Sequence, residues 1–316
     1  MAVPSNTIQN VARVGVREDL SDKIAELFPD DTPFMKAIGR STANGTFPEW
    51  QTDTLTAANQ DNAAIQGDDL VNEVRANTVR VGTYTQIFTK VVGASTTVDW
   101  TSKAGRKREL ARELMKAGRE IRTDQEKRFV GNYASVAPAA GVPGKTAGAQ
   151  AWLTTNTSRG ATGANGGFAA NIVAIATNGT QRAYTEALLK PVLQSIWVAG
   201  GNPSMVFTNG TQKQAEAAFA GLAQSRRETG DKAITIVAAA DIYLSDFGPV
   251  QFVPDRFADA RSALIIDPEF WDIAIGEDLI TDDLAKTGLS TRKYLRTEIA
   301  LRSLNQAASG VVADLL

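Results

Sequence analysis

The stretch KAGRKRELARELMKAGREIRTDQEKR, residues 103–128, determines how the rest of the chain is interpreted, because it is the clearest long helix in the sequence. Leu110, Leu114, Ala117 and Ile121 recur at helical spacing and form a narrow apolar stripe. Ten basic and five acidic side chains lie in the same stretch. A helix rises about 1.5 Å per residue, so this one would span roughly 39 Å. We expect a helix this long and this charged to lie along a surface and not inside a core.

Opposite charges stand four residues apart within this helix. Lys116 precedes Glu120 and Asp124 precedes Arg128, so each pair is expected to add about 0.2–0.5 kcal/mol of support. The basic residues also raise the alternative of nucleic-acid binding. However, the charges point in all directions, acids interleave with them, and no aromatic platform accompanies them. We therefore interpret the stretch as a helix that forms salt bridges between chains, with a weak contact to nucleic acid left open.

Upstream of the helix, residues 47–100 predict a long hairpin with a wide polar tip. VRVGTYTQIF (79–88) alternates β-branched or aromatic residues with other types, which is typical of a strand. FPEWQTDTLTAANQDNAAIQGDDL (47–70) is polar and rich in turn residues. Few apolar residues in that tip can pack locally, so we expect it to rest on another surface.

The first residues predict an extended arm with one short helix. In REDLSDKIAELF (17–28), Leu20, Ile24 and Leu27 recur at helical spacing, and Pro29 and Pro33 are expected to end the helix. This apolar stripe implies a docking partner.

Downstream of the long helix, residues 134–181 are rich in Gly, Ala, Thr and Asn and predict a long surface loop anchored by apolar side chains such as Trp152. A mixed α/β segment follows. We expect helices at 185–201 and 211–224, strands at 202–210, 233–239, 242–255 and 262–268, and a strand or short helix within 292–316.

Composition narrows the chemistry. The chain has 316 residues, enough for one large or two moderate domains, with no cysteine and no histidine. Disulfides, thiolate or imidazole catalysis and the common zinc sites are therefore excluded. The net charge of −2 offers no overall basic field to a nucleic acid or membrane. The sequence shows neither a signal peptide nor a membrane span, so we expect the protein to stay in a cytoplasm.

Three motif-like patterns are better explained without chemistry. AAGVPGKT (139–146) ends like a phosphate loop but lacks the first glycine, the preceding strand and the following helix. Ser290 and Lys293 have the spacing of a Ser-Lys pair, yet the accompanying boxes are missing or out of order. The acidic pairs at 68–69, 277–278 and 282–283 show no calcium-loop pattern and are interpreted as solvated charge.

The element order and several phrases resemble a known family. The phrases are GGNPSMVFTNGTQKQAEAAF (200–219), IYLSDFGPVQFVPDRF (242–257), SALIIDPEFWDIAI (262–275) and LAKTGLSTRKYLRTEIALRSLNQAASGVV (284–312), with weaker likeness at 108–131, 148–156 and 177–189. Together they resemble the SU-ten-like major capsid proteins of tailed bacteriophages, whose fold is of the Hong Kong 97 type.

The resemblance implies an α+β chain divided as in that fold. It implies an N-terminal arm (1–46), an extended hairpin or E-loop with the start of the peripheral domain (47–100), a spine helix with a long surface loop (101–184), an axial α/β domain (185–280), and a C-terminal segment returning to the peripheral domain (281–316).

The function implied is a major capsid protein that is not an enzyme and needs no cofactor or metal. Copies would form hexamers and pentamers of an icosahedral head that assembles in the host bacterial cytoplasm around double-stranded DNA. A portal protein is an expected partner, and a decoration protein is a further candidate. Because the arm starts almost at Met1, a separate scaffolding protein is expected too.

For the assembly contacts we expect the hairpin to face the spine helix of a neighbouring copy. Expected on the hairpin are Trp50, Asp53, Asp61, Asp68 and Asp69, and on the helix Arg106, Arg108, Arg112 and Arg119. Such charge pairs set register more than affinity. Two alternatives remain: the shell of a cellular nanocompartment that encloses enzymes, and a hydrolase that uses carboxylates or the Ser290–Lys293 pair.

Overall fold

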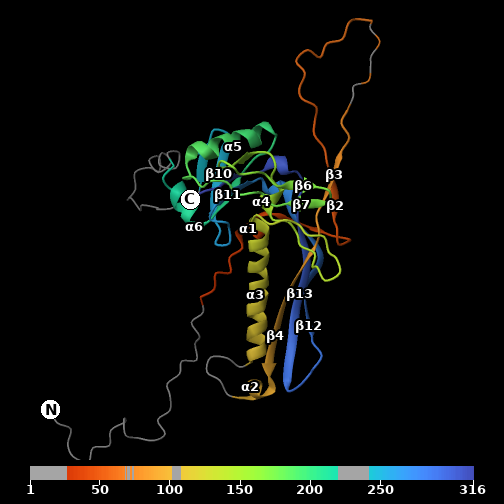
Figure 1. Ribbon diagram of the computed structural model, residues 1–316, viewed down its shortest axis with the longest axis vertical. Coiled ribbons are helices and arrows are strands. Elements are labelled where there is room, and N and C mark those ends of the chain that lie inside the picture. Colours follow the sequence, from red (N-terminus) through yellow and green to blue (C-terminus); the bar gives the residue numbers. More distant parts are fainter. Residues whose placement is uncertain (1–26, 68, 70–71, 73–74, 102–107, 220–241) are drawn as a thin grey trace, which may run out of the picture.

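The computed structural model describes residues 27–67, 69, 72, 75–101, 108–219 and 242–316 (Figure 1). A long helix and a four-stranded sheet form the elongated part of the molecule, and a six-stranded sheet with two helices forms a broader head at one end of it. The strand expected at 233–239 and nearly all of the helix expected at 17–28 lie outside the described residues. Pro33 begins a short helix, α1 (Pro33–Ala37), instead of ending one, because proline fits the first helical turn.

The long helix is α3 (Glu109–Val130), and the predicted stripe faces inward, with Ala117 and Ile121 fully buried. The expectation of a surface helix is wrong for its last turns, where Gln125, Glu126 and Phe129 are buried. This end of the helix meets both α1 and the head, so it has protein on more than one side.

The expected helix pairs at four-residue spacing do not form. Glu120 and Asp124 both pair with Lys90 of the neighbouring sheet, and Lys116 pairs with Glu113. Arg128 donates instead to the backbone carbonyls of residues 134 and 146. A strand packed beside the helix therefore supplies partners that the helix sequence alone does not reveal.

The four-stranded sheet has the order β1 (Gly39–Thr42), β12 (Trp271–Asp283), β13 (Ser290–Ser303) and β4 (Gln86–Ser95). β1 runs parallel to β12, and the other neighbours are antiparallel. Phe88 of β4 meets Phe129 of α3 with ring centroids 6.5 Å apart, and Leu295 and Ile299 of β13 join the same buried cluster. The sheet thus brings together the arm, the hairpin and the C-terminal strands.

The six-stranded sheet of the head has the order β5 (Thr157–Ser158), β14 (Gly310–Ala313), β11 (Ser262–Ile266), β8 (Met205–Thr208), β10 (Gly248–Pro254) and β9 (Ile242–Ser245). The predicted helix at 185–201 is α5 (Glu186–Val198), and the strand predicted at 202–210 is β8. The helix predicted from 211 is the shorter α6 (Gly210–Glu216). The strand predicted at 242–255 is a hairpin, since Gly248 adopts a positive φ at its turn.

The hairpin is confirmed as β2 (Glu49–Thr52) paired antiparallel with β3 (Val79–Gly82). The predicted continuous strand 79–88 is broken, however, between β3 and β4. Thr83 and Thr85 are both buried at this break, and from there Phe88 is buried while Ile87 is half-exposed. The inward face therefore changes within the stretch that the alternation marks as one strand.

Residues 134–181 are only in part a surface loop. They contain α4 (Ala149–Trp152), β5, β6 (Gly167–Ala169) and β7 (Ile172–Ala174). Residues 146–153 are buried, whereas about half of the segment is exposed. Trp152 anchors it as expected, stacking on Phe168 with ring centroids 6.0 Å apart. Glycine and other small residues are needed in this segment because backbone segments approach one another closely there. A composition that is typical of loops therefore permits tight packing here.

The last part of the chain divides between the two sheets. β12 and β13 are long strands of the four-stranded sheet and are followed by the single turn η3 (Gln306–Ala308). β14, in contrast, lies inside the six-stranded sheet. The division expected at residue 281 therefore passes through β12, and the domain boundaries stay predictions. Among the described helices, none has the length and apolar character needed to span a bilayer.

Candidate interaction surfaces

The hairpin is anchored to the molecule at its base, whereas its described residues beyond the base are exposed. Half-buried Trp50 of β2 packs on Trp152 at 5.5 Å between ring centroids, and the guanidinium of Arg302 lies 5.7 Å from its ring centre. Glu49 and Arg80 pair across the two strands at 3.1 Å. Trp50 therefore anchors the hairpin to its own chain, a role different from the expected contact with a neighbour.

Beyond this base, the described residues between 53 and 78 lie on a loop that leaves the body of the molecule (Figure 1). Every described residue of the loop is exposed, including Leu55 at 98% and Ile65 at 77%. Asp53 and Asp61 are exposed on it, and Asp69 is exposed and has an interaction partner. Asp68 lies outside the described residues. A loop of this length without local packing is typical of a segment that orders against another surface.

The basic residues of α3 are largely engaged within their own chain. Arg112 lies 3.9 Å from Glu109 and 3.5 Å from Glu113. Arg119 lies 3.6 Å from Asp30, and its guanidinium is 5.6 Å from the ring centre of Phe28.

Arg108 occupies the position before the first residue of the helix and is exposed, and Arg106 lies outside the described residues. The loop and the first turn of α3 are at opposite ends of the molecule (Figure 1), so the expected pairing is not made within one chain.

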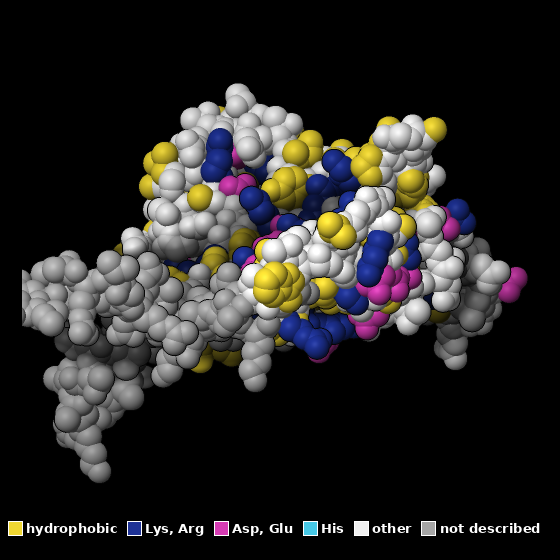
Figure 2. Space-filling view, turned by 90° about the horizontal axis from the view of Figure 1, so that it is seen from below, with side chains coloured by type: hydrophobic (Ala, Val, Ile, Leu, Met, Phe, Trp, Pro, Cys, Tyr) yellow, Lys and Arg dark blue, Asp and Glu magenta, His cyan; other side chains and the backbone are white. Residues whose placement is uncertain are grey.

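Charges of both signs are intermingled on the face that Figure 2 shows. Lys and Arg side chains lie next to Asp and Glu side chains there, and the blue areas do not merge into a single basic surface. This pattern agrees with salt bridges, as expected for the charged helix, more than with a nucleic-acid surface.

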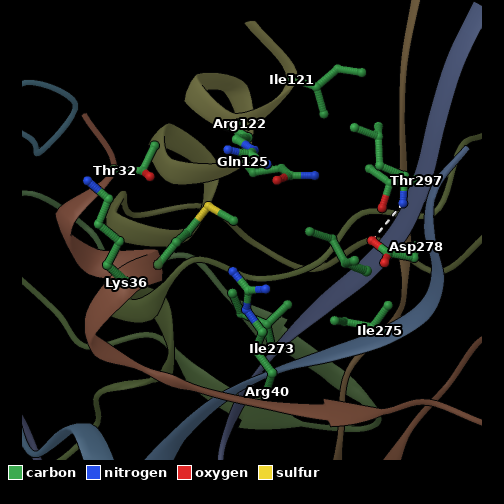
Figure 3. A pocket seen from close by; sticks show the side chains of 13 residues that line it. Thr32, Lys36, Arg40, Ile121, Arg122, Gln125, Ile273, Ile275, Asp278 and Thr297 are labelled. Carbon is green, nitrogen blue, oxygen red and sulfur yellow. Dashed lines mark hydrogen bonds between the residues drawn. The ribbon is translucent and has the colours of Figure 1, made fainter. Parts of the chain in front are cut away.

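A pocket opens where α1, β1, α3 and β12 meet, and we call it the α1–β12 pocket (Figure 3). Its volume is about 210 Å³, well above the ~10–15 Å³ that one water requires. Its apolar lining comes from Met35, Ile121, Ile273, Ile275, Leu279 and Ile299. Lys36, Arg40 and Arg122 also line it, against one acid, Asp278.

Two of the three cations of the pocket have no acid partner. Lys36 pairs with Asp31, but Arg40 and Arg122 are exposed and form no ion pair within the described part of the chain. Sequence reasoning missed this pocket, because Arg40 comes from the arm and Arg122 from the helix. The register Arg40↔Ile273 between β1 and β12 places Arg40 at the pocket.

Buried acids are a second feature that the sequence did not reveal. Glu126 accepts hydrogen bonds from the backbone N–H groups of Phe34 (2.6 Å) and Met35 (3.0 Å). Burial, and then the nearby Asp255 carboxyl, raise the pKa of Glu126 to about 8. Burial likewise raises the pKa of Glu216 to about 8. Ile121 and Phe129 are eight residues apart, so helical spacing places position 125 between them on the same inner face. This spacing is the sequence signal that could have indicated burial at this end of α3.

The motif-like patterns have no site geometry. Thr146 of the phosphate-loop-like stretch is fully buried and donates its backbone N–H to Gln86 at 3.3 Å. Ser290 and Lys293 stand three apart on a strand and so point to opposite faces, and Lys293 pairs with Asp283 at 3.0 Å. Among the described residues, no group of three or more acids is placed to hold a metal ion.

Comparison with known proteins agrees with this architecture. The model of the SU10 major capsid protein family matches residues 3–316. The major capsid protein of Escherichia phage Phieco32 is 26% identical over 333 residues, covering 94% of each chain. The capsid asymmetric unit of cyanophage A-1(L) superposes with a TM-score of 0.69 at 12% identity, covering 98% of this chain and 99% of that one.

A further structure shows how widely the fold is shared. The encapsulin SrpI of Synechococcus elongatus PCC 7942, in its holo complex, superposes with a TM-score of 0.57 at 11% identity, covering 98% of this chain and 96% of that one. At this identity the likeness shows the fold alone, which is of the Hong Kong 97 type, as expected. The family match over nearly the whole length decides between the two kinds of shell. This chain belongs to the SU10 major capsid protein family and is the major capsid protein of a bacteriophage, a component of the virion.

Proposed function

We propose that copies of this chain assemble through hexamers and pentamers into an icosahedral head that encloses double-stranded DNA. The observation that carries the proposal is that every described residue between 53 and 78 is exposed, including Leu55 and Ile65, whose apolar side chains are available for burial against another molecule. Assembly takes place in the host bacterial cytoplasm, with portal and scaffolding proteins as partners and a decoration protein as a further candidate. The chain contributes no catalysis, and it contacts DNA only non-specifically.

The loop is proposed to lie across the spine helix of a neighbouring copy. Asp53, Asp61, Asp68 and Asp69 would face bases among Arg106, Arg108, Arg112 and Arg119. Arg108 is the clearest partner, since it is exposed and forms no ion pair within the described residues, whereas Arg112 and Arg119 already have acids beside them. Contacts of this kind fix the register of subunits and speed their encounter.

Electron microscopy of the purified protein, expressed alone and together with its neighbouring genes, tests the assembly. We expect rings of five and six copies and closed shells. Monomers under both conditions would contradict the proposal. For the pairing, Arg108→Glu should lower the yield of shells, while Lys145→Glu, an exposed charge reversal away from the first turn of the helix, serves as the control. Equal yields from the two variants would exclude Arg108 as a partner.

A further inference from the structure

Four asparagines of the chain are followed directly by glycine, namely Asn44, Asn165, Asn178 and Asn209. In such a pair the backbone nitrogen of the glycine can attack the side-chain carbonyl carbon of the asparagine, because no Cβ shields that nitrogen and the glycine backbone turns easily. The attack requires that the asparagine side chain and the glycine nitrogen can both move. Hydrogen bonds and packing around each pair therefore decide which asparagine reacts.

In two of the pairs the asparagine side chain is held. The Asn165 amide accepts a hydrogen bond from Arg159 at 2.6 Å and donates one to the carbonyl of Thr154 at 2.7 Å. The Asn209 amide stands at the start of α6 and donates to the carbonyl of Ala258 at 3.2 Å. Neither side chain can turn toward the following glycine without breaking these bonds.

In a third pair the attacking nitrogen is held. The backbone N–H of Gly179 donates to the buried carboxylate of Asp314 at 2.7 Å, and the Gly179 carbonyl accepts from Arg261 at 3.0 Å. The backbone of residues 160–163 lies so close that a Cβ on Gly179 would be 2.6 Å from a carbonyl oxygen. Asn178 itself is exposed, but the nitrogen that would attack it is fixed in another direction.

Asn44 and Gly45 lack these restraints. Both are exposed, and neither takes part in a hydrogen bond within the described part of the chain. A Cβ built on Gly45 would meet nothing within 4 Å beyond its immediate neighbours in the chain. The pair lies in the bend between β1 and β2, where both the side chain and the nitrogen can move.

We propose that Asn44 is a site of spontaneous modification, at which it becomes a succinimide and then aspartate or isoaspartate. The Gly45 nitrogen forms a bond to Cγ of Asn44, the Cγ–Nδ2 bond breaks, and ammonia leaves with the proton that the Gly45 nitrogen gives up. Water then opens the ring. Opening at Cγ yields aspartate, and opening at the backbone carbonyl carbon yields isoaspartate, whose main chain is longer by one carbon atom.

The modification would fall at the joint between the arm and the hairpin. The Ala43 N–H donates to the carbonyl of Ile275 at 2.8 Å, and the Thr46 carbonyl accepts the N–H of Thr85 at 2.9 Å, so the chain is fixed on both sides of the pair. Isoaspartate inserts an atom between these fixed points, and both products add a negative charge. One chain contains both reacting groups, so the inference goes beyond the proposed assembly and does not depend on it.

Peptide mapping by mass spectrometry follows all four pairs in one sample, so that Asn165, Asn178 and Asn209 serve as internal controls. The full chain is incubated folded and, in parallel, unfolded in guanidinium chloride. The mass gained when an amide becomes a carboxylic acid is then measured at each pair. In the folded chain Asn44 should convert at least about tenfold faster than the other three, a barrier difference of about 1.4 kcal/mol. In the unfolded chain the four should convert at similar rates, because the restraints are gone.

A variant tests the chemistry at Asn44 itself. Gly45→Ala keeps Asn44 and has room for its methyl group, but this group hinders the attacking nitrogen, so conversion should slow by a similar factor. Circular dichroism verifies that the variant is folded. The inference is overturned if Asn165, Asn178 or Asn209 converts as fast as Asn44 in the folded chain. It is equally overturned if Asn44 stays intact there while it converts in the unfolded chain.

Discussion

Glu126 connects the arm to the spine helix at the level of single atoms. Its two carboxylate oxygens accept the backbone N–H groups of Phe34 and Met35, which lie at the start of α1. These bonds lower the pKa of Glu126, but burial and the Asp255 carboxyl outweigh them and raise it to about 8. The side chain is therefore protonated in the folded chain over a pH range in which an unfolded glutamate is charged.

This raised pKa predicts that stability falls as the pH rises from about 4.5 to about 8. Between the ordinary value of 4.5 and the folded value, the folded chain binds more protons than the unfolded chain, so raising the pH favours unfolding. Urea unfolding at pH 5 and at pH 8 should show a smaller difference in midpoint for Glu126→Gln than for the unaltered chain. Asp53→Asn, at an exposed acid, should leave the difference unchanged. An unaltered difference in the Glu126 variant would show that another group is responsible.

Gly148 is predicted to be irreplaceable for steric reasons. A Cβ at this position would lie 2.1 Å from the carbonyl oxygen of Gly131 and 2.9 Å from that of Arg128, both backbone atoms of the spine's end. Gly148→Ala should therefore destabilise the chain by about 1–3 kcal/mol, the usual cost of overpacking. Gly45→Ala is the control, since a Cβ there meets nothing within 4 Å. Thermal unfolding of both variants compares the two costs, and equal melting temperatures would refute the argument.

Some residues were predictable from local pattern and others were not. Ala117 and Ile121 face inward as their spacing indicated. The contact of Trp50 with Trp152 was not predictable, because the two lie about a hundred residues apart in sequence and no local pattern links them. The expected contact of Trp50 with a neighbour stays a prediction.

At the scale of elements, α3 is held to the sheet by apolar contacts more than by ion pairs. Ile121 is fully buried between them, whereas Lys90, Glu120 and Asp124 keep a third to a half of their side chains exposed. Ile121→Ala should thus cost about 2–5 kcal/mol. Lys90→Ala should cost less than about 1 kcal/mol, because solvent screens the exposed pairs. Urea denaturation measures both, and a Lys90 variant as unstable as the Ile121 variant would mean that the ion pairs hold the helix.

Helices with a regular stripe were predicted well, and the long strands were not. β12 went unrecognised because its first half is buried on both faces and its second half is exposed, so the sequence changes from an apolar run to a polar one. The segment 134–181 was misread for a related reason: its glycines serve close backbone contact, and composition alone does not distinguish this from a flexible loop.

At the scale of the whole molecule, the fold was predicted from the order of arm, hairpin, helix and α/β segment together with the phrases that resemble a known family, although β12 was not recognised locally. Surfaces to which several elements contribute could not be predicted from the sequence. The α1–β12 pocket depends on the parallel pairing of β1 with β12, across more than two hundred residues of chain. Contacts between copies depend in addition on how several chains are arranged, so the pairing of loop acids with spine bases stays a prediction.

The loop itself offers the sharpest separation of folding from assembly. Thr52 and Val79 are direct partners in the hairpin, so residues 53–78 can be replaced by Asn-Gly, the pair that favours a two-residue hairpin turn. The described loop residues are all exposed, and a shorter loop has a smaller entropic cost of closure, so the replacement should not lower the unfolding free energy. Circular dichroism should therefore show a normally folded chain, while electron microscopy shows no closed shells under conditions in which the full chain forms them. Shells of ordinary yield from the shortened chain would mean that the copies are joined by other surfaces, and that the loop's exposure serves a different partner.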